Sequence, residues 1–311
     1  MRIAVMGTGG LGGLLGGLQA RAGHDVTFVA RGANLAALQQ IGLTVQLHDE
    51  EFHLTVSATD EPGDLSPVDV IWFCVKTYDA EHAATQILPL IGPETMVLPV
   101  QNGVGTAEML ESMLGRGHVL GAVNLGGATL VSPGVVAAKG LRRELAVGEL
   151  GGGRSARLDE LSEVLASSGI DVQIKDDIQV EIWDKWVVAC VTLGLCALLR
   201  QPLEPIFANS ESAELASGVM NEAVAVARAR GVSLPHGTVD RWMQYVRERI
   251  AATPGLAGSM YYDILQGRKL ELDAMNGAAV RYGRELNVPT PLNFVVYAAL
   301  LPYANGGPSA K

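Results

Sequence analysis

A glycine-rich stretch near the start of the chain has the spacing of a nucleotide-binding loop. Gly7, Gly9 and Gly12 form the pattern G-x-G-x-x-G, with Gly10 inside it, directly after the apolar run "RIAVM" and at the start of an expected helix. Glycines at this spacing allow a tight turn and a close approach of a pyrophosphate to the backbone, and a helix N-terminus favours negative charge. The stretch therefore predicts a dinucleotide site, with a purely structural glycine turn as the alternative.

The residue after the second expected strand bears on which dinucleotide is bound. That strand, about Asp25 to Ala30, ends where an NAD-selective chain usually places a carboxylate that accepts hydrogen bonds from the ribose. This chain has Arg31 there. A guanidinium cannot accept those hydrogen bonds but pairs with a 2′-phosphate, so we expect NADP(H) as the cofactor. Stacking of Arg31 on the adenine, without selection of the phosphate, is the alternative.

Two polar side chains follow later apolar runs of the same half of the chain. They are Lys76 in "VKTYD" and Asn102 in "QNGVG". Open α/β sheets bind ligands at the carboxyl ends of their strands, so we expect both residues to contact the cofactor and Asn102 to contact the substrate as well. A solvated lysine and a turn asparagine are the alternatives.

A third polar group, Lys185 in "IWDKW", precedes a long run that is nearly free of charged residues. An ammonium stabilises negative charge that develops on a nearby substrate oxygen and can neutralise it by transferring a proton. Desolvation beside the apolar run would lower the pKa of Lys185 toward the working range. The alternative is a lysine that extends from the end of a core helix to water.

Alternating apolar runs and helical segments indicate which elements position these residues. The runs "RIAVM", "DVTFVA", "VDVIWFCV" and "TMVLPV" fit parallel strands covered on both faces. Helical segments begin near Leu11, Ala33, Asp79 and Thr106, which predicts repeated βα units and a doubly wound sheet. The stretch "LTVQLHDEEFHLTVSA" predicts a hairpin. The stretches "ATLVSPGVVAAKG" and "RRELAVGEL" predict antiparallel strands that extend the same domain.

From about Asp176 onward the pattern becomes helical. Long helices are expected over 177–200, 209–230, 236–251 and 261–285, with no convincing strand. We therefore expect an α/β fold with an N-terminal Rossmann-type domain over residues 1–176 and an all-helical C-terminal domain over residues 177–311.

The composition indicates whether the protein binds nucleic acid, a membrane or a metal ion. The chain has 311 residues, 48% of them hydrophobic, and a formal charge of −10, which argues against nucleic acid. The apolar run from Trp186 to Leu199 is shorter than about 20 residues and indicates a core helix rather than a membrane span. Cys74, Cys190 and Cys196 show no metal-ligand pattern and are expected as small buried side chains. We expect a cytoplasmic protein, and the apolar C-terminal helices are compatible with a homodimer.

The motifs around Lys76, Asn102 and Lys185, together with "SMYYDILQGRKLELDAMNGAAV" from Ser259, resemble the ketopantoate reductase (2-dehydropantoate 2-reductase) family. The resemblance extends from Met1 to about Ala299. It implies a Rossmann domain, a helical domain and an active site in the cleft between them. It also implies NADPH-dependent reduction of a 2-oxo acid to a 2-hydroxy acid, with ketopantoate to pantoate, a step of pantothenate biosynthesis, as the leading reaction.

The same resemblance implies roles for individual residues. Lys185 corresponds to the catalytic lysine that donates a proton to the ketone oxygen, and Glu271 in "KLELD" to the acid that orients it. Ser259 corresponds to a contact with the substrate carboxylate, with a helix cap as the alternative. Asn102 corresponds to a contact at the nicotinamide and the substrate.

Two positions depart from the family pattern. Family members usually carry asparagine four residues after the catalytic lysine and often another four later, where this chain has Ala189 and Leu193. Positions 185, 189 and 193 recur every four residues, so both residues share one helical stripe with Lys185. A more apolar 2-oxo acid or another carbonyl compound is therefore an alternative substrate. A β-hydroxyacid dehydrogenase and a non-enzymatic NADP(H) sensor are further alternatives, and the retention of Lys185, Glu271 and Ser259 argues against the sensor.

Overall fold

The computed structural model describes residues 1–124, 126–139 and 144–307. The chain divides into two compact units: Met1–Gln101 with Thr106–Gln179, and Asn102–Gly105 with Val180–Lys311. The division after Gln179 lies just beyond the boundary expected at 176/177. The short loop Asn102–Gly105 belongs to the second unit, although the sequence on either side of it belongs to the first.

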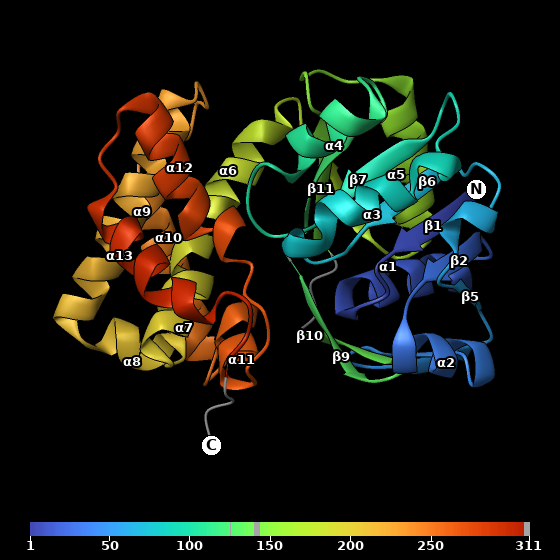
Figure 1. Ribbon diagram of the computed structural model, residues 1–311, viewed down its shortest axis with the longest axis horizontal. Helices are drawn as coiled ribbons and strands as arrows, with labels where there is room; N and C mark the ends of the chain where they lie inside the picture. The colour runs from blue at the N-terminus through green and yellow to red at the C-terminus, as the bar shows by residue number, and fades with distance from the viewer. Residues whose placement is uncertain (125, 140–143, 308–311) are drawn as a thin grey trace. The chain divides into compact units, whose positions relative to one another are not determined.

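A five-stranded sheet forms the centre of the first unit, in the order β5-β2-β1-β6-β7, with every pair of neighbours parallel. The four expected runs form strands of this sheet, which confirms the Rossmann-type domain (Figure 1). The strands are β1 (Arg2–Met6), β2 (Asp25–Val29), β5 (Ser57–Thr59), β6 (Val70–Phe73) and β7 (Met96–Pro99). Helix α1 (Gly10–Arg21) lies between β1 and β2 in the chain, α2 (Gly32–Gln40) follows β2, α3 (Ala80–Gln86) lies between β6 and β7, and α4 (Thr106–Leu114) follows β7.

Side chains of the central strands alternate between two hydrophobic clusters, as the two-residue period of a strand requires. Val5 and Trp72 pack in the cluster that contains the apolar side chains of α1. Met6 and Phe73 pack in the cluster that contains residues of α3 and α4. Both faces of the sheet are therefore covered, which explains why these strands read as continuous apolar runs.

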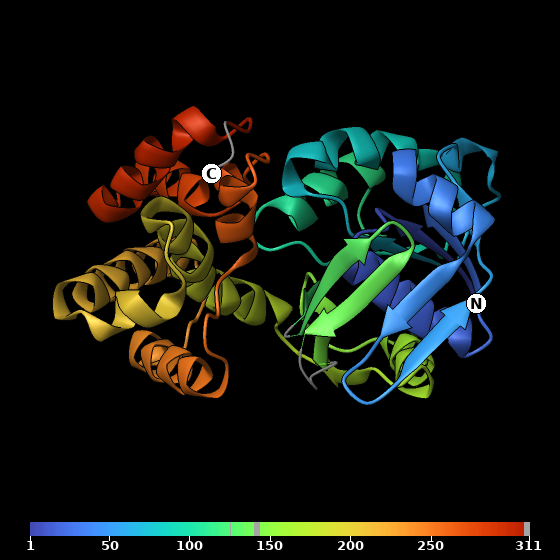
Figure 2. The same cartoon turned by 90° about the horizontal axis from the view of Figure 1, so that it is seen from below.

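The remaining strands form two further sheets. The expected hairpin is present, and its strand β3 also pairs with β10, which gives a four-stranded sheet in the order β4-β3-β10-β9 (Figure 2). A three-stranded sheet has the order β12-β11-β8. The strands are β3 (Leu43–Gln46), β4 (Glu51–Leu54), β8 (Leu120–Asn124), β9 (Gly127–Ser132), β10 (Val135–Lys139), β11 (Glu144–Glu149) and β12 (Asp171–Ile174). Strands β8 and β12 were not expected from the sequence.

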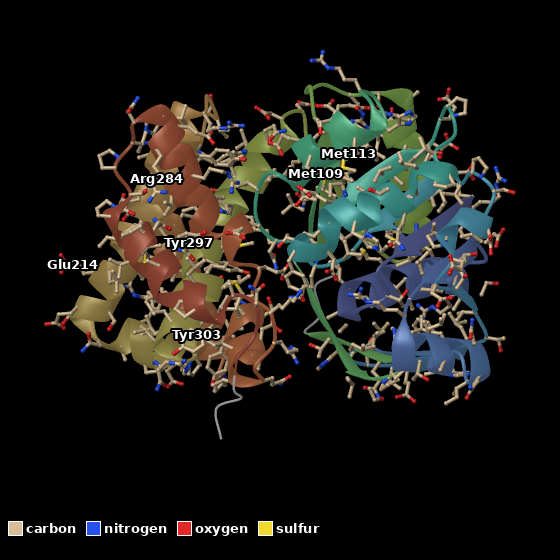
Figure 3. All side chains as sticks on the ribbon, in the orientation of Figure 1. Met109, Met113, Glu214, Arg284, Tyr297 and Tyr303 are labelled. Carbon is tan, nitrogen blue, oxygen red and sulfur yellow. The ribbon has the colours of Figure 1, made fainter. Side chains whose placement is uncertain are left out.

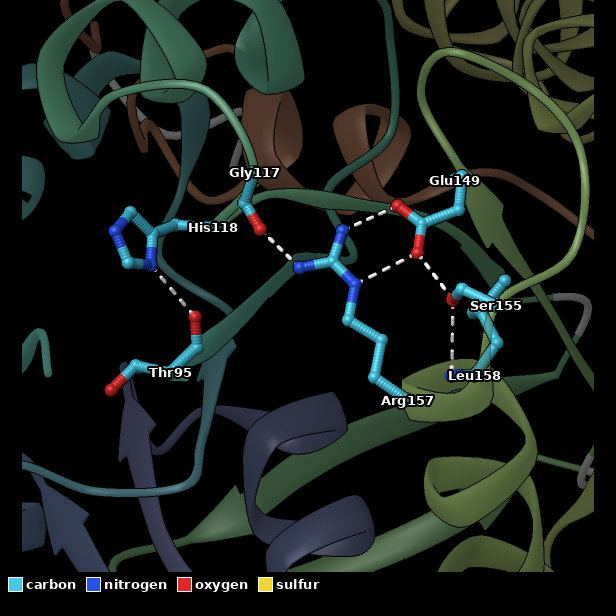
Figure 4. A network of polar contacts seen from close by, with 7 residues as sticks. All are labelled: Thr95, Gly117, His118, Glu149, Ser155, Arg157 and Leu158. Atoms are coloured by element: carbon cyan, nitrogen blue, oxygen red, sulfur yellow. Dashed lines mark hydrogen bonds and ion pairs between the residues drawn. The ribbon is translucent and has the colours of Figure 1, made fainter. Parts of the chain in front are cut away.

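A polar network joins β11 to the start of helix α5 (Ala156–Ser167) (Figure 4). The Arg157 Nε donates to Glu149 Oε1 at 2.7 Å, and its Nη1 donates to the carbonyl of Gly117. Ser155 Oγ donates to the same Glu149 oxygen at 2.6 Å and accepts from Leu158 N as the cap of α5. The hydrogen bond from Arg157 is the main reason that the pKa of Glu149 lies below its usual value.

The second unit is helical beyond its short loop, as expected. Its helices are α6 (Ile178–Ala189), α7 (Cys196–Leu199), α8 (Leu203–Ala208), α9 (Ser210–Ala229), α10 (Thr238–Ala252), α11 (Ser259–Leu265), α12 (Asn276–Leu286) and α13 (Pro291–Leu300). Residues Cys190–Leu195 form a π-helix between α6 and α7. Tyr297 of α13, labelled in Figure 3, donates its hydroxyl to Asp273 at 3.1 Å.

The single helix expected over 261–285 is wrong, because two helices lie there with an irregular segment between them. Helix α11 ends before Gly267, which has a positive φ of 66°. Arg268 Nε then donates to the buried carboxylate of Asp263 at 2.8 Å, and Leu270 N donates to the carbonyl of Ala304 at 3.0 Å. These bonds fix the segment that carries Glu271.

The apolar helical segment Ile178–Leu199 is long and apolar enough to cross a membrane, with a mean hydropathy of 1.7. Inside the folded protein 67% of its most apolar window is buried, which is typical of a core helix. Cys190 and Cys196 are buried within it, while Cys74 of the first unit is half-buried, and all three are free thiols.

Candidate active site

The packing of the protein itself requires three of the loop glycines. Gly7 has a φ of 97°, and a Cβ there would lie 2.8 Å from the nitrogen of Val75. A Cβ on Gly10 would lie 2.5 Å from the carbonyl oxygen of Ala128, and one on Gly12 would lie 2.3 Å from that of Gly7. These glycines shape the turn and seat α1, whatever the loop binds.

Gly9 is different, because a Cβ there would meet nothing within 4 Å. It caps the N-terminus of α1 without a side-chain hydrogen bond. Open space beside a helix N-terminus leaves room for an anionic group, so the loop fits the pyrophosphate of a dinucleotide. The sequence reasoning missed Asn34, whose Nδ2 donates to the carbonyl of Thr8 at 2.7 Å and fixes the loop from α2.

The carboxyl ends of β2, β1 and β6 lie next to one another, since these strands are neighbours in the sheet. Arg31 follows β2 and caps α2, and its side chain is exposed. Lys76 follows β6 and is half-buried. Arg31 Nη2 makes an ion pair with Asp79 Oδ2 at 2.5 Å. The sequence reasoning did not associate Asp79 with this edge, because the two residues are 48 positions apart.

Gln101 is a further candidate that sequence reasoning missed. Both polar atoms of its amide are buried and have no hydrogen-bond partner among the described residues. Native proteins seldom leave such groups unpaired, so an unpartnered amide next to a binding motif is a candidate ligand contact. Its position beside Asn102 in "QNGVG" was the available signal.

Lys185 lies on α6 in the second unit, between the buried rings of Trp183 and Trp186 in the sequence. The residue as a whole is half-buried, and burial lowers the pKa of its ammonium to about 8. The indole of Trp186 donates to the carbonyl of Met275 at 3.3 Å. This bond fixes the helix next to Lys185 against the segment that follows Glu271.

Glu271 is 4% exposed and directly precedes a short 3₁₀ turn, Leu272–Ala274. The loop that begins with Asn102 packs on the same turn. Val104 N donates to the carbonyl of Ala274 at 3.4 Å, and a Cβ on Gly103 would lie 2.6 Å from that oxygen. The segments that carry Lys185, Glu271 and Asn102 therefore meet at residues 274–275.

The residue before Ser259 packs against the π-helix Cys190–Leu195, which follows the helix that carries Lys185. Gly258 N donates to the carbonyl of Thr192 at 3.1 Å, and a Cβ on Gly258 would lie 3.1 Å from the Cα of Leu193. Gly258 caps α11, so Ser259 is its first helical residue and is not the helix cap that was the alternative. Its side chain is exposed.

The π-helix corrects the expectation of one continuous stripe after Lys185. Its i→i+5 hydrogen bonds turn the chain less per residue than an α-helix, so residues beyond Ala189 rotate away from that stripe. Ala189 and Leu193 are 3% and 6% exposed and belong to the apolar core. Asn276 Nδ2 supports the π-helix by donating to the carbonyl of Cys190 at 3.2 Å, an interaction that the sequence did not indicate.

Both halves of the chain match models of one protein family. Residues 3–152 match the family model described as ketopantoate reductase PanE/ApbA, and residues 177–304 match that of its C-terminal domain. The chain is 34% identical to the 2-dehydropantoate 2-reductase of Mesorhizobium japonicum, with 94% of each chain covered.

Solved structures are also similar. The 2-dehydropantoate 2-reductase from Geobacter metallireducens GS-15 has a TM-score of 0.91 at 30% identity, covering 97% of this chain and 99% of that chain. A ternary structure of D-mandelate dehydrogenase with NADH and anilino(oxo)acetate shares the fold, with a TM-score of 0.90 at 24% identity and 98% of both chains covered. The chain is thus a pyridine-nucleotide oxidoreductase and belongs to the ketopantoate reductase family.

Proposed function

We propose that this chain catalyses the NADPH-dependent reduction of ketopantoate to pantoate. The observation that carries the proposal is Lys185, a half-buried lysine whose pKa burial lowers to about 8. Such an ammonium stabilises negative charge on a ketone oxygen and gives up its proton near neutral pH. The curated relatives named 2-dehydropantoate 2-reductase support ketopantoate as the substrate.

The remaining residues act in binding and orientation. NADPH, when bound, supplies the hydride. Lys185 donates a proton to the ketone oxygen, and Glu271, on the segment fixed next to the same helix, orients the ammonium. Ser259 holds the substrate carboxylate, and Asn102 contacts both the nicotinamide and the substrate.

Arg31 supports NADPH rather than NADH, and the glycine loop supports the binding of a dinucleotide. The backbone at Gly7, Gly9, Gly10 and Gly12 holds the pyrophosphate, with Lys76 as a further cofactor contact. Arg31, at the neighbouring strand end, pairs with the 2′-phosphate. We also place the protein in the cytoplasm, since its three cysteines are free thiols. The exposed side chains of Phe294 and Val295 on α13 give an apolar face that a homodimer would cover.

A panel of 2-oxo acids tests the proposal. Purified protein is mixed with NADPH and ketopantoate, its deshydroxy analogue or pyruvate, and NADPH absorbance is followed, with Lys185→Ala as the control. We expect rapid oxidation of NADPH with ketopantoate and at least about 10²-fold slower oxidation by the variant. NADPH binding without oxidation by any 2-oxo acid would instead identify a sensor.

A more apolar 2-oxo acid is the second candidate because Ala189, four residues after Lys185 on α6, is a buried apolar residue. Its side chain cannot form a hydrogen bond with a substrate hydroxyl. A higher kcat/KM for the deshydroxy analogue than for ketopantoate in the same panel would favour this candidate.

A further inference from the structure

The ion pair between Arg31 and Asp79 joins two loops at the carboxyl edge of the parallel sheet. Arg31 follows β2, and Asp79 ends the turn that follows β6. Arg31 Nη2 and Asp79 Oδ2 lie 2.5 Å apart, and 81% of the arginine side chain and 28% of the aspartate side chain are exposed. The pair therefore forms at the surface, where a ligand can reach the guanidinium.

The position of the pair relates it to the glycine loop. Strands β2 and β6 lie on either side of β1 in the sheet, so an interaction between their following loops spans the carboxyl end of β1. The loop after β1 begins there, with the nitrogens of Gly7 and Thr8 both donating to the carbonyl of Val29 at 3.2 Å. Asp79 thus lies at the edge where a bound dinucleotide places the ribose of its adenosine half.

The carboxylate of Asp79 is not engaged in capping the helix that it precedes. Asp79 occupies the cap position of α3, yet its side chain makes no capping hydrogen bond. Its backbone nitrogen donates to the carbonyl of Lys76 at 2.9 Å, which holds the turn together independently of the side chain. The side chain is therefore directed to Arg31 rather than to the local backbone.

We infer that Asp79 determines how strongly this enzyme discriminates between NADPH and NADH, by competing with the 2′-phosphate for Arg31. The inference rests on the proposed contact between Arg31 and the 2′-phosphate. A carboxylate beside the guanidinium neutralises part of its charge and repels a phosphate that approaches the same group. The same carboxylate oxygen is an acceptor for the 2′-hydroxyl of NADH, which the end of β2 does not provide. Asp79 consequently weakens NADPH binding and supports NADH binding.

Fluorescence titration of NADPH and NADH in the absence of substrate tests this inference on Asp79→Asn and Asp79→Ala. The Asn variant removes the charge but keeps an acceptor oxygen, so we expect NADPH to bind about 3- to 5-fold more tightly and NADH to bind unchanged. The Ala variant removes the acceptor as well, so NADH binding should also weaken. Because the effect is electrostatic, the gain for NADPH should shrink at about 1 M salt, where the Debye length is about 3 Å.

Asp159→Asn is the matched control, because it breaks another exposed Arg–Asp pair of the same unit, with Arg154 at 2.7 Å. This variant should leave both affinities unchanged. Unchanged or weaker NADPH binding by Asp79→Asn would overturn the inference, as would equal weakening of both cofactors. Arg31→Ala distinguishes failure of the inference about Asp79 from failure of the proposed contact between Arg31 and the 2′-phosphate. If this variant leaves NADPH affinity unchanged, the proposed phosphate contact itself is wrong.

Discussion

The pH dependence of turnover follows from the burial of Lys185. Burial lowers the pKa of this lysine from 10.5 to about 8, which corresponds to about 3 kcal/mol against its charged form. Reduction requires the protonated ammonium as the proton donor. We therefore expect kcat/KM for ketopantoate to be constant below about pH 8 and to fall about tenfold for each pH unit above it.

The assay is the initial rate of NADPH oxidation with saturating NADPH and ketopantoate well below its KM, between about pH 6 and pH 10. NADPH deuterated at the transferred position shows, through a slower rate, that the chemical step limits turnover. Lys185→Ala should lower kcat/KM by at least about 10²-fold and remove the inflection. Lys175→Ala, which removes a lysine from the first unit, should keep the wild-type profile.

The same burial has a consequence for stability. Between about pH 8 and pH 10.5 the unfolded chain holds a proton on Lys185 that the folded protein has lost, so stability rises with pH across this window. Below about pH 8, Lys185 is charged in the folded protein as well, and the burial of this charge lowers the free energy of unfolding. Lys185→Met should therefore raise the free energy of unfolding at about pH 7 by up to about 3 kcal/mol. A kcat/KM profile that stays flat through pH 8 to 9 while chemistry limits the rate would contradict the role of Lys185 as the proton donor.

Three further predictions concern other residues. Gly9→Ala should weaken NADPH binding about tenfold or more without changing thermal stability, whereas Gly12→Ala should lower stability because its Cβ would lie 2.3 Å from a carbonyl oxygen. Titration with NADPH and thermal unfolding distinguish the two variants. Equal NADPH affinity of wild type and Gly9→Ala would contradict the assignment of Gly9 to the pyrophosphate site. Ala189→Asn should raise the ratio of kcat/KM for ketopantoate to that for its deshydroxy analogue, and a flat ratio with an intact fold would mean that residue 189 does not contact the substrate hydroxyl. The lowered pKa of Glu149 beside Arg157 stabilises the fold above the unfolded value of about 4.5, and this contribution is lost as pH falls through the lower folded value. Glu149→Gln should therefore cost about 1–3 kcal/mol in urea unfolding at about pH 7 and less in acid, and equal stability at both pH values would argue against the role of the pair.

The first unit could be predicted in detail because its signals are local. Each central strand is a short apolar run bounded by turn residues, and the spacing of Gly7, Gly9 and Gly12 marks the turn into α1. The cluster of glycines nevertheless suggested more ligand contact than the structure supports. Only Gly9 among these three faces open space, while the others are needed by packing contacts.

The features that the sequence did not indicate depend on contacts between distant residues. Apolar periodicity cannot distinguish a continuous helix from one with a π-helical turn, which here is supported by Asn276, 86 positions from its partner Cys190. The break before Glu271 likewise depends on Ala304, which accepts a hydrogen bond from Leu270. Asp79 could not be associated with Arg31 without the order of the strands.

The reduction of ketopantoate by NADPH is tested most directly by following the transfer of deuterium from cofactor to substrate in a single turnover. Enzyme in excess over ketopantoate is mixed with NADPH carrying deuterium at the transferred position, and the product is identified by mass spectrometry and NMR. We expect pantoate with one deuterium at C2, formed together with one equivalent of NADP⁺, and a much slower reaction with Lys185→Ala. Tight NADPH binding with no labelled hydroxy acid, or formation of labelled pantoate at the same rate by Lys185→Ala, would contradict this expectation.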